Sequence, residues 1–266
     1  MEEILKEYFD LDVMRDTFPE VLAGFWFTIK LSVLAGILSL LWGLVLAVLR
    51  QTPGKLGAII RWPTIAYIDI MRGLPQLIVI LLVFGFFGEL AESGLLPTEI
   101  AIPRWFGQPD PFWYGVVAIT LTYGAYMAEV YRAGIEAVPK GQTEAARSLG
   151  MSYGQAMRFV VVPQAVRKVV PPLLNDFIAL MKDTSLVSVI GLIEVVQVGR
   201  DIQSDTFNSS ALTLGAILFL LFTIPLARVV DYLISRQQRY TRAGGGGPAE
   251  PAPAGAAGSG QPGGPV

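Results

Sequence analysis

Cysteine and histidine are both absent from this chain of 266 residues. Without cysteine the chain forms no disulfide bond and has no thiol nucleophile, and without histidine it has no imidazole base. The usual zinc ligands are missing with them, as are the Cys and His ligands of haem. These absences exclude the enzyme classes that depend on such groups.

Charged residues are scarce as well. They make up 16% of the chain, whereas hydrophobic residues make up 53%, more than the roughly 45–50% of an ordinary soluble domain. A helix that crosses a bilayer needs about 20 mostly apolar residues. Five such stretches occur, at residues 21–49, 62–88, 111–131, 171–198 and 206–227. The sequence therefore predicts an all-α integral membrane protein with five transmembrane helices.

The segments between these stretches alternate in charge. Basic residues gather in three of them, at 50–61, 132–170 and 236–242. Acidic residues predominate in the other three, at 1–20, 89–111 and 200–208. Because short basic loops stay in the cytoplasm, we expect the N-terminus outside the cell membrane and the C-terminus inside, in the cell's inner or plasma membrane.

The two ends of the chain differ from the predicted transmembrane domain of residues 21–242. Residues 1–20 are acidic and lack the basic start of a signal peptide, so we expect an extracytoplasmic segment that is not cleaved. Residues 243–266 are almost entirely Gly, Pro and Ala, with a single acid. Such a composition buries too little apolar surface to fold, and we expect disorder there.

The longest cytoplasmic connection contains two short helical patterns, at about residues 140–165. The first begins at Glu144 and ends at Gly150, where a left-handed residue is most easily placed. The second begins at Ser152 and is expected to stop at Pro163. Local physics leaves two interpretations open, a helix lying on the membrane surface and a helix docking to a partner protein.

A resemblance favours the second interpretation. The segment resembles the EAA loop of binding-protein-dependent ABC importer permeases, with the family's spacing of residues Glu144, Ala145, Ala146, Gly150, Val160, Val162 and Pro163. The stretches YGAYMAEVYRAGIEAVPKGQTEAARSLGMS and VPQAVRKVVPPLLNDFIALMKDTSL resemble the polar amino acid branch, which includes histidine, glutamine and arginine permeases. The likeness covers roughly residues 20–235.

The resemblance implies a permease subunit, not an enzyme, in an ATP-driven importer of polar amino acids. Its implied partners are ABC ATPase subunits, a second permease chain, identical or homologous, and an extracytoplasmic substrate-binding protein, with no nucleic acid. ATP and Mg are expected on the ATPase and no cofactor on this chain, which lacks the G-x-x-x-x-G-K-S/T phosphate loop. The residues implied to couple to the ATPase are Glu144, Ala145, Ala146, Leu149 and Gly150.

Charged residues within the predicted spans are candidates for functional sites, because charge in hydrocarbon is costly. Asp69 and Arg72 lie three residues apart in the second span, and Glu129 lies near the inner end of the third. We predict that these three form a structural ion-pair cluster. No metal site is predicted.

The fourth span carries Lys182, Asp183, Thr184 and Ser185 near the middle of the bilayer, and Asn175 and Asp176 about two turns closer to the cytoplasm. A zwitterionic amino acid needs an acceptor for its ammonium group and donors for its carboxylate, and these residues offer both. Lys182 and Asp183 could instead neutralise charges on neighbouring helices, which is the favoured interpretation for that pair. Asn175 and Asp176 are the substrate candidates, and a carboxylate at 176 favours a basic amino acid.

Two alternative functions remain open on the sequence. A freestanding carrier or channel would need no ATPase, although five spans do not divide into the equal repeats that secondary transporters often show. A membrane enzyme would need Lys30 or Lys182 as its base, and nothing in the sequence places either beside a suitable serine.

Overall fold

The computed structural model describes residues 2–95 and 97–244, and within these ranges the chain is helical and contains no β-strand. The elements are α1 (Glu2–Tyr8), α2 (Leu11–Arg50), α3 (Gly54–Gly73), α4 (Gln76–Ser93), α5 (Thr98–Ala101), η1 (Trp105–Gly107), α6 (Asp110–Glu136), α7 (Lys140–Ser148), α8 (Tyr153–Ala156), η2 (Met157–Val161), α9 (Val162–Asp183), η3 (Thr184–Ile190), α10 (Val195–Thr206) and α11 (Ser210–Gly244). The prediction of an all-helical fold is confirmed for this part of the chain.

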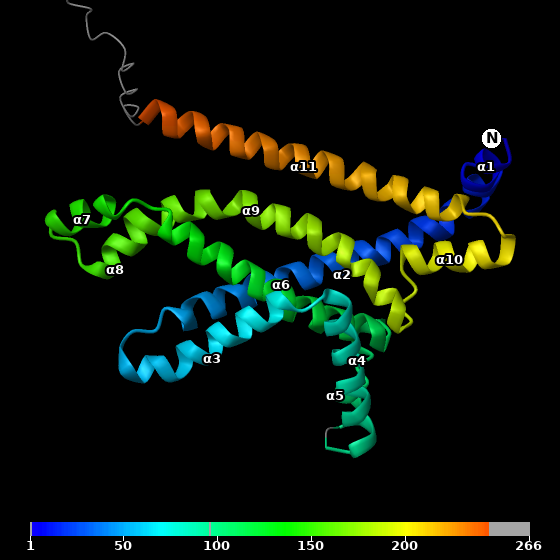
Figure 1. Ribbon diagram of the computed structural model, residues 1–266, viewed down its shortest axis with the longest axis horizontal. Coiled ribbons are helices and arrows are strands. Elements are labelled where there is room, and N and C mark those ends of the chain that lie inside the picture. The colour runs from blue at the N-terminus through cyan, green and yellow to red at the C-terminus, as the bar shows by residue number, and fades with distance from the viewer. Residues whose placement is uncertain (1, 96, 245–266) are drawn as a thin grey trace, which may run out of the picture.

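The long helices α2, α6, α9 and α11 run along the longest axis of the molecule (Figure 1). Helices α7 and α8 lie at one end of this bundle, together with the start of α3. Helices α1 and α10 lie at the opposite end, and α4 with α5 extends away from the bundle. The elbow between α7 and α8 is therefore far from the N-terminal segment.

Close packing of α2 against α6 forms the centre of the bundle. Gly43 of α2 approaches α6 so closely that an added Cβ would lie 2.8 Å from Met127 Cβ and 2.9 Å from the carbonyl oxygen of Gly124. A main cluster of buried side chains extends this contact toward α4 and η3, with Leu31, Ile119 and Leu180 fully buried. Small residues at this contact allow the two backbones to approach, as is common between membrane helices.

Replacing Gly43 with alanine is expected to lower the free energy of unfolding by about 2 kcal/mol, because the new methyl group has no room. Gly85→Ala in α4 is the matched control, since nothing lies within 4 Å of a Cβ there. Denaturant unfolding of both variants in detergent micelles checks this. Equal stabilities of the two variants would contradict the close approach of α2 and α6.

The predicted second span of residues 62–88 is wrong as a single helix. Helix α3 ends at Gly73 and α4 begins at Gln76, and the two point in different directions (Figure 1). Pro75 disfavours the helical conformation of the residue before it, and Leu74 is extended, with φ −91° and ψ 138°. The break therefore has a local cause that the long apolar stretch hides.

The predicted fourth span of residues 171–198 is also wrong in its bounds. Helix α9 begins at Val162, so Pro171 and Pro172 lie inside the helix, not at its start. It ends at Asp183 and continues as the 3₁₀ segment η3, which Gly191 closes with a left-handed φ of 89°. A separate helix, α10, follows.

Three helical segments of the described residues are long and apolar enough to cross a membrane: Glu2–Arg50, Gln76–Ser93 and Ser210–Arg236. Helices α6 and α9 are not among these segments. The count of five spans thus stays a prediction. Helix α11 extends to Gly244, and the rest of the tail predicted to be disordered, 245–266, lies outside the described residues.

The N-terminal segment is tied to the start of α11. The backbone N–H of Asp10 donates to Ser210 Oγ at 2.8 Å, and the N–H of Ser209 donates to the carbonyl of Glu7 at 2.8 Å. The side-chain amide of Asn208 donates to the carbonyl of Lys6 at 3.0 Å. These bonds form a clasp between α1 and the α10–α11 connection, joining residues about 200 positions apart in the sequence.

Candidate functional site

The elbow of residues 149–152 joins α7 to the next helix. Helix α7 begins at Lys140 after Pro139, so the predicted start at Glu144 is wrong by one helical turn. It ends at Ser148 with Leu149 as its C-cap, and the left-handed residue that follows is Gly150, as predicted, with a φ of 84°. The N–H of Gly150 donates to the carbonyl of Arg147 at 3.0 Å and that of Met151 to the carbonyl of Ala146 at 3.2 Å. This pair of bonds is a Schellman motif, which satisfies carbonyls left over at the helix end.

The far side of the elbow is capped as well. Ser152 and Gln155 form a capping box: the Ser152 N–H donates to Gln155 Oε1 at 2.7 Å, and the Gln155 N–H donates to Ser152 Oγ at 3.3 Å. The guanidinium of Arg147 donates to the carbonyl of Met151 at 2.9 Å and spans the turn. The elbow is therefore held by its own backbone and side chains at both ends.

The second helix does not stop at Pro163, contrary to the prediction. After α8 the chain makes one π-helical turn, η2, and enters α9 without a break. Pro163 is the second residue of α9 and directly follows the π-helical turn, so the proline lies inside continuous helix. The elbow is thus connected through continuous helix to Asp183.

The predicted coupling residues differ in exposure. Glu144, Ala145, Leu149 and Gly150 are exposed, and the Leu149 side chain is 82% exposed. Ala146 is buried against the chain itself. Four of the five predicted coupling residues are therefore accessible on the surface.

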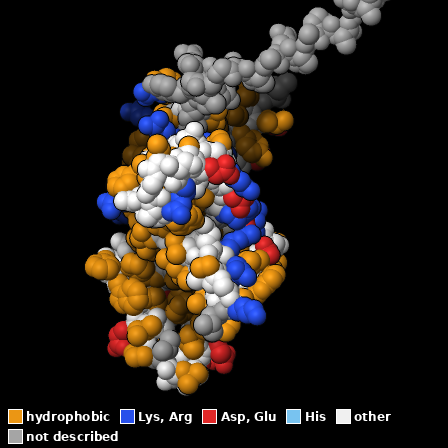
Figure 2. Space-filling model, turned by 90° about the vertical axis from the view of Figure 1, so that its left-hand side faces the viewer, with side chains coloured by type: hydrophobic (Ala, Val, Ile, Leu, Met, Phe, Trp, Pro, Cys, Tyr) orange, Lys and Arg blue, Asp and Glu red, His pale blue; other side chains and the backbone are white. Residues whose placement is uncertain are grey.

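Lys and Arg side chains gather over the end of the molecule that carries α7 and α8 (Figure 2). The elements meeting at this end are basic in sequence, with Arg50 at the end of α2 and Lys140 and Arg147 in α7. This end therefore carries the segments for which a cytoplasmic position is predicted.

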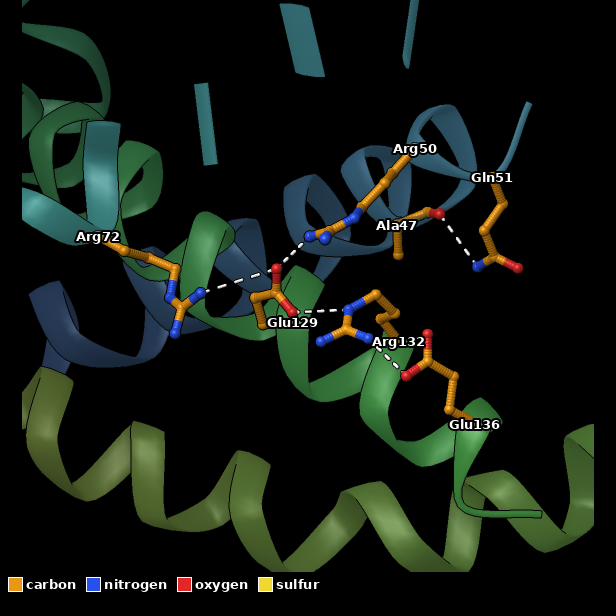
Figure 3. A network of polar contacts seen from close by, with 7 residues as sticks. All are labelled: Ala47, Arg50, Gln51, Arg72, Glu129, Arg132 and Glu136. Atoms are coloured by element: carbon orange, nitrogen blue, oxygen red, sulfur yellow. Dashed lines mark hydrogen bonds and ion pairs between the residues drawn. The ribbon is translucent and has the colours of Figure 1, made fainter. Parts of the chain in front are cut away.

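Glu129 of α6 is the centre of an ion-pair network (Figure 3). Its carboxylate bonds to the guanidinium of Arg50, lies 2.8 Å from Arg132 Nε and 3.7 Å from Arg72 Nη1. Arg132 also pairs with Glu136 on the next helical turn. The Glu129 side chain is only 14% exposed, so one largely buried carboxylate serves three arginines.

Two of the three residues predicted for this cluster, Arg72 and Glu129, lie together. Asp69 is exposed and forms no ion pair among the described residues, although it precedes Arg72 by one turn. Arg50 is a further partner that the sequence does not reveal, because it is 79 residues from Glu129 and belongs to the basic segment 50–61 that is predicted to be a cytoplasmic loop. Only the packing of α2 against α6 brings it there.

The polar residues of α9 and η3 have different surroundings. Tyr123 of α6 donates its hydroxyl to Asp183 Oδ2 at 2.8 Å, and Thr184 is fully buried with its Oγ1 3.3 Å from Ser32 Oγ. Ser185 donates to the carbonyl of Lys182 at 2.7 Å. These contacts give Asp183 and Thr184 partners within the chain.

Asn175 and Asp176 have a different character. Asn175 is exposed, and Asp176 is partly buried with its Oδ2 inaccessible and without a hydrogen-bond partner. Lys182 is exposed and forms no ion pair among the described residues, so the predicted neutralising role of that lysine finds no partner within them. Asp176 is thus the residue of this group with a buried side-chain oxygen that has no hydrogen-bond partner among the described residues.

Glu194 is a buried polar residue that the sequence reasoning missed. Its side chain is fully buried and caps α10, accepting from the N–H groups of Val196 at 2.9 Å and Gln197 at 3.0 Å. Thr28 Oγ1 lies 3.3 Å from its second oxygen. The rule that flags isolated charge in an apolar stretch could have found Glu194, since it lies within the predicted span 171–198.

Comparisons with known proteins give consistent matches. Residues 39–239 match the family described as binding-protein-dependent transport system inner membrane component. The chain is 34% identical over 236 residues to the probable glutamine ABC transporter permease protein GlnM of Bacillus subtilis strain 168, covering 86% of this chain and 99% of that protein. It is 34% identical over 191 residues to the arginine transport system permease protein ArtQ of the same organism, covering 71% of this chain and 79% of that protein.

A solved structure agrees with these relatives. The crystal structure of an amino acid ABC transporter with histidines superposes with a TM-score of 0.72 at 33% identity, covering 84% of this chain and 96% of that chain. The similarity therefore includes most of the described helices and extends well beyond the segment of residues 140–165.

Proposed function

Because the chain belongs to the family of binding-protein-dependent transport system inner membrane components, we propose that it is the permease subunit of an ATP-driven importer of polar amino acids. A separate ATPase would bind ATP and Mg and supply the energy, and a soluble extracytoplasmic protein would deliver the amino acid. The observation that carries the proposal is the capped elbow at Gly150, which exposes Leu149 and continues into α9.

The elbow is suited to transmit force from a partner. Both of its ends are fixed by local hydrogen bonds, and no flexible segment separates α8 from α9. A push on α7 would therefore move the part of α9 that carries Asp176. We assign contact with the ATPase to Glu144, Ala145, Leu149 and Gly150, and a packing role to Ala146.

The expected setting is the plasma membrane, with five passes and the elbow in the cytoplasm. The basic side chains over the α7–α8 end support this orientation (Figure 2). The extended apolar helix α4, which is mostly exposed, supports the need for a second permease chain, identical or homologous. The pathway would then lie between two chains.

The direct test is reconstitution of the chain with its ATPase and its binding protein in liposomes. Amino acids delivered by the binding protein are expected to stimulate ATP hydrolysis and to accumulate inside. Uptake by this chain alone, without any ATPase, would contradict the proposal and favour a freestanding carrier.

For the cargo, we assign substrate contact to Asn175 and Asp176. The relatives named above are described for glutamine and for arginine at the same 34% identity, so overall similarity does not select between neutral and basic cargo. The Oδ2 atom of Asp176 has no hydrogen-bond partner among the described residues, and because it is closed to solvent a substrate would reach it only after the surrounding helices move. A cationic side chain such as that of arginine, lysine or histidine would supply the missing partner.

Asp176→Asn is expected to reduce stimulation of ATP hydrolysis by basic amino acids about tenfold relative to stimulation by glutamine, since an ion pair is replaced by a hydrogen bond to a neutral amide. Stimulation measured across a panel of amino acids checks this. Asp183→Asn is the control, because Asp183 already accepts from Tyr123. If Asp176→Asn keeps the wild-type preference for basic amino acids over glutamine, Asp176 does not contact the substrate's side chain.

A further inference from the structure

A basic cavity lies beside the ion-pair network, between the ends of α2, α3 and α6. Its volume is about 290 Å³, and its lining residues are Arg50, Gln51, Arg61, Ile65, Arg132, Ile135 and Glu136. Four of these, Arg50, Gln51, Arg132 and Glu136, are drawn in Figure 3 around the network. The lining thus places three arginines against one carboxylate.

The arginines retain unused hydrogen-bond donors. Each guanidinium has five N–H groups. Arg50 gives one bond to Glu129, and Arg132 is shared between Glu129 and Glu136. Arg61 donates only to the carbonyl of Thr52, at 3.2 Å, and pairs with no carboxylate of the described residues. The cavity can therefore accept a further anion.

The surface beside the cavity is apolar. Helix α3 exposes Ile60 and Trp62, the chain neighbours of the cavity residue Arg61, with Trp62 65% exposed. Tryptophan is enriched where a membrane helix meets the headgroup region. An anion in the cavity would thus lie next to a surface suited to hydrocarbon chains.

We propose that this cavity binds the phosphate group of an anionic membrane lipid. Arg50, Arg61 and Arg132 would contact the phosphate, and the acyl chains would lie along the exposed side of α3. Basic pockets between helices on the cytoplasmic side are suited to such headgroups. The inference rests on the proposed function only for the membrane setting and for the cytoplasmic position of this end.

The test uses the full chain in nanodiscs made from a mixture of phosphatidylcholine and phosphatidylglycerol. After detergent extraction, native mass spectrometry measures which lipid stays bound. The wild-type chain is expected to retain phosphatidylglycerol in preference to phosphatidylcholine. Arg61→Gln is expected to lower that retention about fivefold, from the effect of one basic residue near a membrane surface.

Two further variants separate a site from general charge. Lys55→Gln removes the same charge from the exposed start of α3, outside the cavity, and should retain phosphatidylglycerol as the wild type does. Arg61→Lys keeps the charge and should retain most of the lipid. Equal retention of both lipids by the wild type, or equal loss in Arg61→Gln and Lys55→Gln, overturns the proposal.

Soluble phosphate is tested as the other source of the same chemistry. In nanodiscs of phosphatidylcholine alone, we expect inorganic phosphate to change the unfolding temperature of the wild type no more than it changes that of Arg61→Gln. A rise specific to the wild type overturns the lipid assignment. ATP hydrolysis measured in the reconstituted complex distinguishes the lipid proposal from the transport proposal. If amino acids stimulate hydrolysis but the chain does not select phosphatidylglycerol, only the lipid proposal fails. If the chain selects phosphatidylglycerol but amino acids do not stimulate hydrolysis, the lipid proposal is supported and the transport proposal is contradicted.

Discussion

Gly150→Asp is expected to reduce ATP hydrolysis in the reconstituted complex to its level without amino acid, and to abolish uptake, while the chain stays folded and inserted. A φ of 84° strains any residue with a side chain, although aspartate is among those that tolerate the left-handed region best, and the control variant described below shares this strain. Nothing lies within 4 Å of a Cβ at this position. The new carboxylate would therefore meet the docked partner and not the chain itself.

Gly54→Asp is the matched control for this variant. Gly54 has a φ of 80°, has nothing within 4 Å of an added Cβ, and lies at the α2–α3 turn. The two variants therefore share the backbone conformation, the open surroundings and the change in charge. In Gly54→Asp we expect amino acids to stimulate ATP hydrolysis, and to be taken up, as in the wild type. Normal coupling in Gly150→Asp as well would show that the elbow does not contact the ATPase.

Glu129→Gln is expected to lower the free energy of unfolding by about 3 kcal/mol, the scale found when one partner of a buried ion pair is removed. Arg50, Arg72 and Arg132 would lose the carboxylate that they share. Denaturant unfolding in detergent and the yield of inserted protein measure the effect. Glu136→Gln is the control, because Glu136 is mostly exposed and pairs only with Arg132, so its change should stay below about 1 kcal/mol.

A second variant tests whether uncompensated charge is the cause. Adding Arg50→Gln to Glu129→Gln removes one of the stranded charges and should recover part of the stability, giving a coupling energy between the two sites. Additive losses would mean that Glu129 contributes through packing alone, contrary to the network drawn in Figure 3.

Features set by neighbouring residues could be predicted from the sequence. The left-handed glycine at 150 and the start of a helix at Ser152 depend on a few adjacent residues, and both are present. The resemblance to amino acid permeases carried by the same segment is confirmed by the family match and the relatives. Local rules failed where a long apolar stretch was read as one helix, although Pro75 marks the break.

Features that depend on packing between distant elements could not be predicted. The approach of Arg50 to Glu129 requires α2 to lie against α6, and the pairing of Tyr123 with Asp183 requires α6 to lie against α9. Neither contact leaves a periodic pattern in the sequence. The residues that contact the ATPase and the amino acid stay predictions, supported by exposure at Leu149 and by the unpaired oxygen of Asp176.

The clasp between α1 and the start of α11 sets an order of events during synthesis. Residues 6–10 leave the ribosome first, and their hydrogen-bond partners at 208–210 follow about 200 residues later. The N-terminal segment therefore stays without these partners until residues 208–210 have been made. The hydrogen bonds that join α1 to the start of α11 can form only after the central helices α2, α6 and α9 have been synthesised.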